Sequence, residues 1–263
     1  MRPYLAQIKG VYMSQIVYRA SFFFTLVGNL LYMALVYFLW SSIYRNSTVI
    51  RGLTFYQTFV YLALASSMFI LFRTYIDWLV SRKILDGSII VDLFKPVDFQ
   101  LMVLSRSAGS ALCTFTIITV PSLAVMLIVA GSALPIGIGW LFFPLGLVLA
   151  FVISFTLDYI VGLTSFYTAS LWGITMTKEI IVTLLSGALI PLQFFPEAVQ
   201  RVLQFLPFQA IYNVPVMMVT QPSQPVVVYV QMLAVQIVWV AVLWGLSRLF
   251  FNKAIRVLTV AGG

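Results

Sequence analysis

Residues 107–157 read SAGSALCTFTIITVPSLAVMLIVAGSALPIGIGWLFFPLGLVLAFVISFTL, a run of 51 residues without a charged side chain. A helix that crosses the hydrocarbon core of a bilayer needs about 20 apolar residues, so this run is too long for one span. In its middle, Gly131-Ser132-Ala133-Leu134-Pro135 favours a turn. The stretch therefore predicts two membrane-spanning helices joined by a very short connection.

Shorter uncharged runs on either side repeat this pattern. Residues 20–44 and 52–72 carry no charge over 25 and 21 residues, and each run is long enough for one span. Two further spans are expected at about residues 171–192 and 226–246. Together with the pair in the long run, these segments make six.

The composition fits a protein whose solvent is largely lipid. Of the 263 residues, 62% are hydrophobic and only 8% are charged, whereas a soluble domain carries about 25% charged residues. We therefore predict an all-α integral membrane protein with six transmembrane helices, forming a single transmembrane domain over residues 1–263. Its net charge of +8 comes mostly from residues at the ends of apolar runs, which predicts contact with membrane lipid and no nucleic acid.

The positive-inside rule gives the expected orientation. With both termini in the cytoplasm, three of the 15 basic residues face outward, namely Arg45, Arg51 and Arg201. The remaining twelve face the cytoplasm: Arg2, Lys9, Arg19, Arg73, Arg82, Lys83, Lys95, Arg106, Lys178, Arg248, Lys253 and Arg256. This bias favours an even number of spans.

The first 19 residues are predicted to form a helix that lies on the cytoplasmic leaflet. Their apolar residues recur at helical spacing and leave Lys9 off the apolar stripe. Basic residues are spread through the segment, and it has no compact apolar core or small-residue cleavage site, so it does not read as a cleavable signal.

Charges concentrate between Arg73 and Arg106, which hold nine of the 22 charged residues in the chain. Residues 77–100 are therefore predicted to be a cytoplasmic loop between the second and third spans. The apolar residues that could line one side of a short helix there are Ile84, Leu85, Ile89, Leu93 and Phe94, and Pro96 would end it. This mixture of apolar and charged residues favours a helix that docks onto another protein, the alternative being a solvated linker.

Prolines mark the segment before the last span. Six of them lie between residues 191 and 225, yet the segment stays apolar, for example at Phe194-Phe195. We predict short re-entrant or interfacial helices on the outer side, packed against protein, because irregular backbone at membrane depth must be shielded from lipid.

Several chemistries are excluded by the sequence. The chain has no phosphate-binding GxxxxGK[ST] loop, no histidine and one cysteine, Cys113, within an apolar run. Neither a Ser-His-Asp triad nor a metal-binding pattern is present, so no catalytic or metal-ligating residue is predicted.

Isolated charges also occur within the apolar runs. Asp158 lies towards one end of the fourth span, and a carboxylate there is either an interfacial residue or a proton or substrate site. Lys178 and Glu179, early in the fifth span, are tolerable close to the membrane interface.

Several short motifs follow one another along the chain. The loop contributes residues 84–98, with Gly87 after an acidic residue and Leu93-Phe94-Lys95-Pro96 further on. Later come Leu185-Ser186-Gly187-Ala188-Leu189-Ile190-Pro191-Leu192, then Phe194-Phe195-Pro196-Glu197, and then Leu206-Pro207-Phe208 with Pro215. Together, in this order and over essentially the whole chain, they resemble the ABC-2-type exporter permeases, the membrane-spanning subunits of ABC transporters.

The resemblance implies a permease that exports a substrate across the bacterial cytoplasmic membrane and has no ATPase activity of its own. Such permeases pair with a second copy or a related permease, and each binds a cytoplasmic ABC ATPase that holds ATP and Mg, while the permease itself holds no cofactor. A coupling helix in the loop would contact the ATPase through Arg82, Lys83, Asp86, Gly87, Asp92 and Phe94. The outer helices would close the exit, with Pro191, Phe194, Phe195 and Pro196 at this gate.

Two alternatives remain open at this point. One is a secondary transporter that couples to protons through Asp158, and the other is a membrane-embedded lipid-modifying enzyme. An enzyme needs acidic, basic or histidine side chains gathered near one interface, whereas the acids here lie mostly in one loop. The transported substrate cannot be read from the sequence.

Overall fold

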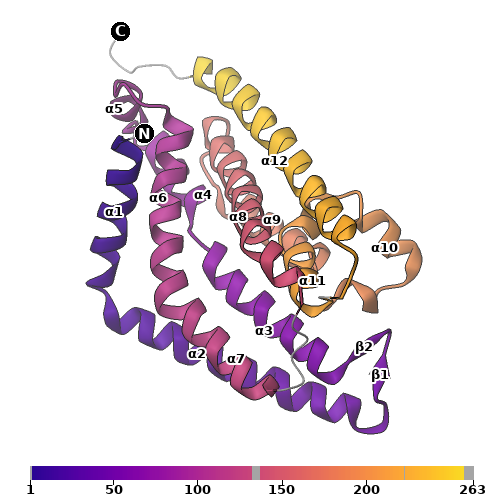
Figure 1. Ribbon diagram of the computed structural model, residues 1–263. Coiled ribbons are helices and arrows are strands. Elements are labelled where there is room, and N and C mark those ends of the chain that lie inside the picture. The colour runs from indigo at the N-terminus through magenta and orange to yellow at the C-terminus, as the bar shows by residue number, and fades with distance from the viewer. Residues whose placement is uncertain (1, 132–136, 222, 258–263) are drawn as a thin grey trace.

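The computed structural model describes residues 2–131, 137–221 and 223–257. These residues are almost entirely helical (Figure 1). The turn predicted at residues 131–135 lies mostly outside the described residues. Of these five, only Gly131 is described, and it directly follows a helix that ends at Ala130.

The helices within the described residues are α1 (Arg2–Ile16), α2 (Arg19–Ile43), α3 (Phe55–Phe72), α4 (Ile76–Leu85), α5 (Ile89–Leu93), α6 (Phe99–Thr114), α7 (Val120–Ala130), α8 (Gly139–Leu163), α9 (Trp172–Leu185), α10 (Glu197–Leu203), α11 (Asn213–Thr220) and α12 (Val226–Ala254). Single 3-10 turns are η1 (Tyr44–Asn46), η4 (Thr164–Phe166), η5 (Leu192–Phe194), η6 (Pro207–Ala210) and η7 (Ile255–Val257), and η2 (Phe115–Thr119) is a π-helical turn. Strands β1 (Val49–Ile50) and β2 (Leu53–Thr54) pair antiparallel after α2.

Five helical stretches in the described part of the chain are long and apolar enough to cross a membrane. They cover Ala20–Asn46, Phe55–Leu85, Phe99–Ala130, Gly139–Phe166 and Val226–Ala254. At the place of the expected fifth span stands α9, which has only 14 residues and is followed by a turn rather than by more helix. The count of six therefore stays a prediction, because it depends on whether α9 and the turn after it cross the bilayer.

Helix α3 lies at the centre of the molecule. Thr54 accepts a hydrogen bond from the backbone N–H of Gln57, and the Gln57 side chain bonds back to Thr54, so a capping box starts the helix. Most of its side chains are buried, among them Phe59, Tyr61 and Leu64, in a core shared with α2, α7, α8, α11 and α12. Twelve of its 18 residues are buried, which fits a helix that is apolar on most of its circumference.

Helix α1 packs along α6 rather than standing alone (Figure 1). Its contacts are largely polar: the Ser105 hydroxyl donates to Gln7, Gln15 donates to Ser110, and the Tyr4 hydroxyl accepts from the backbone N–H of Asp98. The backbones approach closely, because a side chain at Gly109 would meet the backbone of α1. The predicted N-terminal helix is thus present, and its place on the leaflet remains a prediction.

The two ends of the described chain lie on the same side of the molecule. The start of α1, the end of α12 and α5 are together at the top of Figure 1, and the β1–β2 hairpin and α10 lie away from them. Helix α8 packs along α12. This arrangement puts the charged loop, the start of α1 and the end of α12 in one region.

Candidate functional site

The charged loop forms two short helices instead of the single helix that the sequence predicts. Helix α4 ends at Leu85 and α5 starts at Ile89. Between them Gly87 has a φ of +75°, a left-handed backbone conformation that glycine adopts without steric cost. Pro96 follows α5 as expected, but the helix has already ended at Leu93. The motif glycine therefore makes a turn that the periodicity of the apolar residues does not reveal.

Asp92 fastens α5 to the end of α4. Its carboxylate accepts the Lys83 ammonium at 2.5 Å and the Lys95 ammonium at 2.6 Å, and the residue is buried. Burial raises the pKa of Asp92, but the hydrogen bonds and charges of Lys83 and Lys95 outweigh it and hold the pKa below its usual range. Two of the predicted coupling residues, Lys83 and Asp92, thus bind each other.

The apolar residues of the loop divide into an inner and an outer set. Ile89 is fully buried against the cluster that includes Val80 and Phe99, and Ile84 and Leu93 pack partly against the same cluster. Leu85, Val91 and Phe94 are exposed, with Phe94 reaching 84%. We call this outer set, Leu85, Val91 and Phe94, the coupling face. Arg82 and Asp86 are exposed beside it.

The loop is held at both ends to long helices. At its start, α4 follows α3 after a three-residue break in which Tyr75 has a φ of +53°. At its end, Asp98 caps α6 by accepting the backbone N–H of Leu101 at 2.8 Å, and it pairs with Arg248 of α12, whose Nη2 donates to Asp98 Oδ1 at 2.8 Å. The coupling face is therefore fixed to α3, α6 and α12.

Acidification should loosen this loop. The folded pKa of Asp92 lies below its unfolded value, which is about 3.9. Asp92 therefore stabilises the folded loop above that pH, and the contribution is lost as the pH falls through the folded pKa. We expect the protection of amides in residues 83–95, taken relative to the intrinsic exchange rate at each pH, to fall below about pH 4 before the protection of α3 does. In Asp92→Asn the protection of the loop should already be low at neutral pH and change less with acid than in the wild type; a wild-type loop whose protection is lost only together with that of α3 would contradict this.

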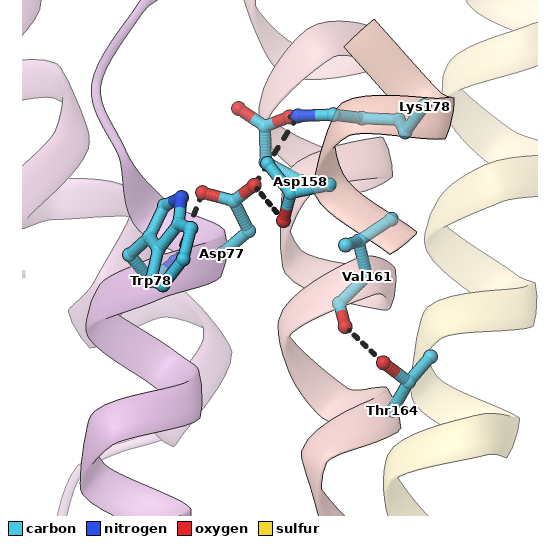
Figure 2. A network of polar contacts seen from close by, with 7 residues as sticks. Asp77, Trp78, Asp158, Val161, Thr164 and Lys178 are labelled. Atoms are coloured by element: carbon cyan, nitrogen blue, oxygen red, sulfur yellow. Dashed lines mark hydrogen bonds and ion pairs between the residues drawn. The ribbon is translucent and has the colours of Figure 1, made fainter. Parts of the chain in front are cut away.

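A second polar site lies deeper, where α4 meets α8 and α9. The Lys178 ammonium is 2.6 Å from Asp158 Oδ1 and 3.3 Å from Asp77 Oδ2 (Figure 2). Asp77 is 2% exposed and Asp158 is 8% exposed. Asp77 also accepts the backbone N–H of Trp78 and the hydroxyl of Thr175. We call Asp77, Asp158 and Lys178 the buried ion cluster.

The sequence alone did not reveal this cluster. Asp158 was expected to be either interfacial or a proton or substrate site, and neither interpretation included its pairing with Lys178. One feature of the sequence could have indicated this pairing. Asp158 and Lys178 carry opposite charges on separate apolar segments, and charges in such segments usually pair with one another. All three residues of the buried ion cluster line one pocket. Glu179, which is next to Lys178, lines this pocket too, together with Arg73 and Tyr212.

The predicted outer gate residues lie in another part of the molecule. Phe194 stacks on Trp40 of α2 with ring centroids 5.2 Å apart, Pro191 is buried, and Phe195 and Pro196 lead into α10. Gly187, just before them, has a φ of +85°, and its Cα faces the Tyr61 hydroxyl of α3 so closely that an added Cβ would be 2.4 Å from it. None of these residues lines the pocket at the buried ion cluster.

Comparison with known families gives one match. The sequence model of the ABC-2 family transporter proteins matches residues 30–262, nearly the whole chain. No curated protein matches it. The matched range includes the coupling face, the buried ion cluster and the segment around Gly187, and it leaves out all of α1 and the start of α2.

Proposed function

Because the chain belongs to the ABC-2 family of transporter proteins, we propose that it is the permease subunit of an ATP-driven exporter. The family makes it a membrane component of a transporter, and the apolar helices make it a multi-pass membrane protein. The family does not favour the two alternatives, a proton-coupled secondary transporter and a lipid-modifying enzyme. The proposal adds direction, energy source and partners: export across a bacterial cytoplasmic membrane, driven by a separate cytoplasmic ATPase.

The observation that carries the proposal is the coupling face. Leu85, Val91 and Phe94 are exposed on a loop in which Ile89 is buried and Ile84 and Leu93 are partly buried. Exposed apolar side chains beside charged residues are typical of a protein–protein interface. Since the chain has no phosphate-binding loop, a partner that hydrolyses ATP is the natural occupant. A groove of this ATPase would bind Val91 and Phe94, and Arg82 and Asp86 would lie at the rim of the interface.

The loop is built to transmit force. Lys83 and Lys95 on Asp92 stiffen it, and Asp98 and Arg248 tie it to α6 and α12. Asp77, on the first turn of α4, joins it through Lys178 to α9. A push on Phe94 would therefore move these helices as rigid bodies, which is how domain closure is passed between packed elements.

The arrangement of the chain supports a cytoplasmic location for both termini. The start of α1, the end of α12 and the coupling loop share one side of the molecule (Figure 1). Ends on one side require an even number of crossings, and with five long helices the sixth crossing would be α9 with the turn after it. The opposite side then holds η5 and α10 as the outer region. We propose that two such subunits, identical or related, enclose the transport path, because six helices are few for enclosing one.

Replacing Phe94 by Asp should separate the permease from its ATPase. A carboxylate in place of a ring that is 84% exposed costs the fold little, but it would have to be desolvated in the interface, which should weaken binding by about 2 kcal/mol or more. The measurement is copurification of the permease with a co-expressed candidate ABC ATPase, and the ATP hydrolysis of the complex.

Phe205→Asp is the matched control, since Phe205 is 80% exposed and lies after α10, away from the loop (Figure 1). The control should copurify and hydrolyse ATP like the wild type. If Phe94→Asp retains the ATPase as firmly as Phe205→Asp does, the coupling face is not the contact, and the proposal fails at this point.

A further inference from the structure

We infer that three adjoining clefts, running from α1, α4 and α6 to α2, α3 and α9, together bind a phospholipid of the cytoplasmic leaflet, with its phosphate at Arg82 and Arg106 and an acyl chain beside Gly28. This inference concerns a ligand of the permease itself and does not rest on the ATPase partnership. It is carried by the adjacency of the three clefts and by the change in polarity along them.

The three clefts adjoin one another, because neighbouring clefts have lining residues in common; we refer to them together as the groove. The first, between α1, α4 and α6, has Gln15, Thr74, Tyr75 and Ser110 in common with the second. The second shares Thr25, Phe69 and Ile70 with the third, which lies between α2, α3 and α9. Their cavity volumes are about 740, 480 and 410 Å³, within the range of clefts that hold small molecules, about 300–1000 Å³.

The groove is basic and polar at one end. Arg82, Lys83 and Arg106 line the first cleft together with a single acid, Asp86. Hydroxyl groups of Ser14, Ser107 and Ser110 lie among them. Such a set of cations and hydrogen-bond donors suits a phosphate group.

Two of the three cations at this end, Arg82 and Arg106, are available to a ligand. Lys83 is already bound by Asp92, which also holds Lys95, and Asp98 is bound by Arg248. Asp92 and Asp98 are thus engaged elsewhere, whereas Asp86 lines this cleft, accepts the backbone N–H of Ser88 and interacts electrostatically with Lys83 and Arg82. Arg82 and Arg106 are exposed, and within the described residues neither is within ion-pair distance of an acid. The cleft therefore carries an excess of positive charge.

The other end of the groove is apolar. Gly28, Ile70, Ala188 and Leu189 line the third cleft with few polar groups. No side chain lies within 4 Å of the place where a Cβ on Gly28 would stand, so the groove is open there. A soluble anion would use only the basic end, whereas a phospholipid has a phosphate for one end and a chain for the other.

The surroundings of the basic end place it at a membrane surface. Tyr18, Tyr75 and Trp78 line the first cleft, and such aromatic side chains gather at the headgroup level. Met13 and Val17 of the adjoining α1–α2 corner are exposed apolar residues. With the loop on the cytoplasmic side, the leaflet in reach is the cytoplasmic one.

The test uses the purified full-length permease without any ATPase. Native mass spectrometry in detergent, with added dioleoyl phosphatidylglycerol, gives the dissociation constant of the tightest-bound lipid. We expect Arg82→Gln with Arg106→Gln to weaken binding about tenfold, because two charge-assisted hydrogen bonds are lost. Arg45→Gln with Arg201→Gln, two exposed arginines outside the groove, should bind like the wild type.

A second pair of variants tests the acyl end. Gly28→Leu fills the open part of the third cleft, and Gly245→Leu places the same side chain on α12, where no atom lies within 4 Å either. Both sites are exposed helix positions, so folding should be affected equally, which melting temperatures check. Gly28→Leu should weaken lipid binding several-fold, and Gly245→Leu should not.

Three outcomes would overturn the inference. The first is equal binding by the Arg82, Arg106 double variant and its control. The second is an unchanged affinity in Gly28→Leu. The third is displacement of the lipid by millimolar inorganic phosphate, which would make the basic end a site for a soluble anion.

Discussion

Lys178→Met should lower the free energy of unfolding by about 3–5 kcal/mol, because it leaves two buried carboxylates without their shared cation. The Lys178 ammonium lies 2.6 Å from Asp158 and 3.3 Å from Asp77, and it is the one cation within ion-pair distance of either acid in the described part of the chain. The measurement is an SDS or thermal unfolding curve of the purified permease. Lys253→Met, at an exposed lysine near the end of α12, is the control and should shift the curve little.

Removing the two acids as well should recover most of this loss. The triple variant Asp77→Asn, Asp158→Asn, Lys178→Met has no buried charge at this place, and a neutral replacement of a buried ion pair is often as stable as the original. If the triple variant is no more stable than Lys178→Met, the loss comes from the volume of the lysine and not from unpaired charge.

Asp158→Asn alone should be milder and separates two functions. Lys178 keeps Asp77 as its partner, so both the fold and ATP-driven transport should persist. Loss of transport in a stable Asp158→Asn protein would instead favour proton coupling through Asp158, the alternative that the sequence left open.

Gly187→Val should cost about 3 kcal/mol or more, for two separate reasons. The backbone at Gly187 has a φ of +85°, where a β-branched residue is strained by about 1–3 kcal/mol. A Cβ there would also stand 2.4 Å from the Tyr61 hydroxyl, and relieving such overpacking costs about 1–3 kcal/mol. Because Tyr61 donates to Asn213 at the start of α11, the outer region should be displaced as well. Unfolding curves give the cost.

Gly52→Val separates the two terms. Gly52 has a φ of +82°, but no atom lies within 4 Å of its Cβ position, so this variant carries the backbone strain without the clash. Gly187→Val should exceed it by the cost of overpacking, and adding Tyr61→Phe should recover part of that difference. Equal losses at the two glycines would show that the contact with Tyr61 is unimportant.

The helical membrane architecture followed from the sequence because the lengths of apolar runs are a local property. Residues 20–44 and 52–72 appear as α2 and α3, and the long uncharged run appears as α6 with α7, and α8. The prediction of a fifth span is weaker, because Lys178 interrupts its apolar run and α9 has only 14 residues. The resemblance to ABC-2 permeases rested on short motifs in a fixed order, and the family match over residues 30–262 confirms it.

The candidate sites were predicted less completely. The loop was found from its charges, and the exposed Leu85 and Phe94 were among its named apolar residues. The turn at Gly87 and the inward position of Ile89 depend on how α5 packs against α4 and α6, which a helical periodicity does not contain. The roles of the coupling and gate residues remain predictions.

By itself, the 51-residue uncharged run determined that the chain belongs in a membrane, because no arrangement of so few charges could keep these helices dispersed in water. Only the tertiary structure decided where the isolated charges go. Asp77, Asp158 and Lys178 come from three helices, 20 to 101 positions apart in the chain, and their pairing exists only once α4, α8 and α9 pack together. The length of an apolar run is a property of one segment of the sequence. The free-energy cost of burying a charge, in contrast, is offset only when the fold places an oppositely charged side chain beside it.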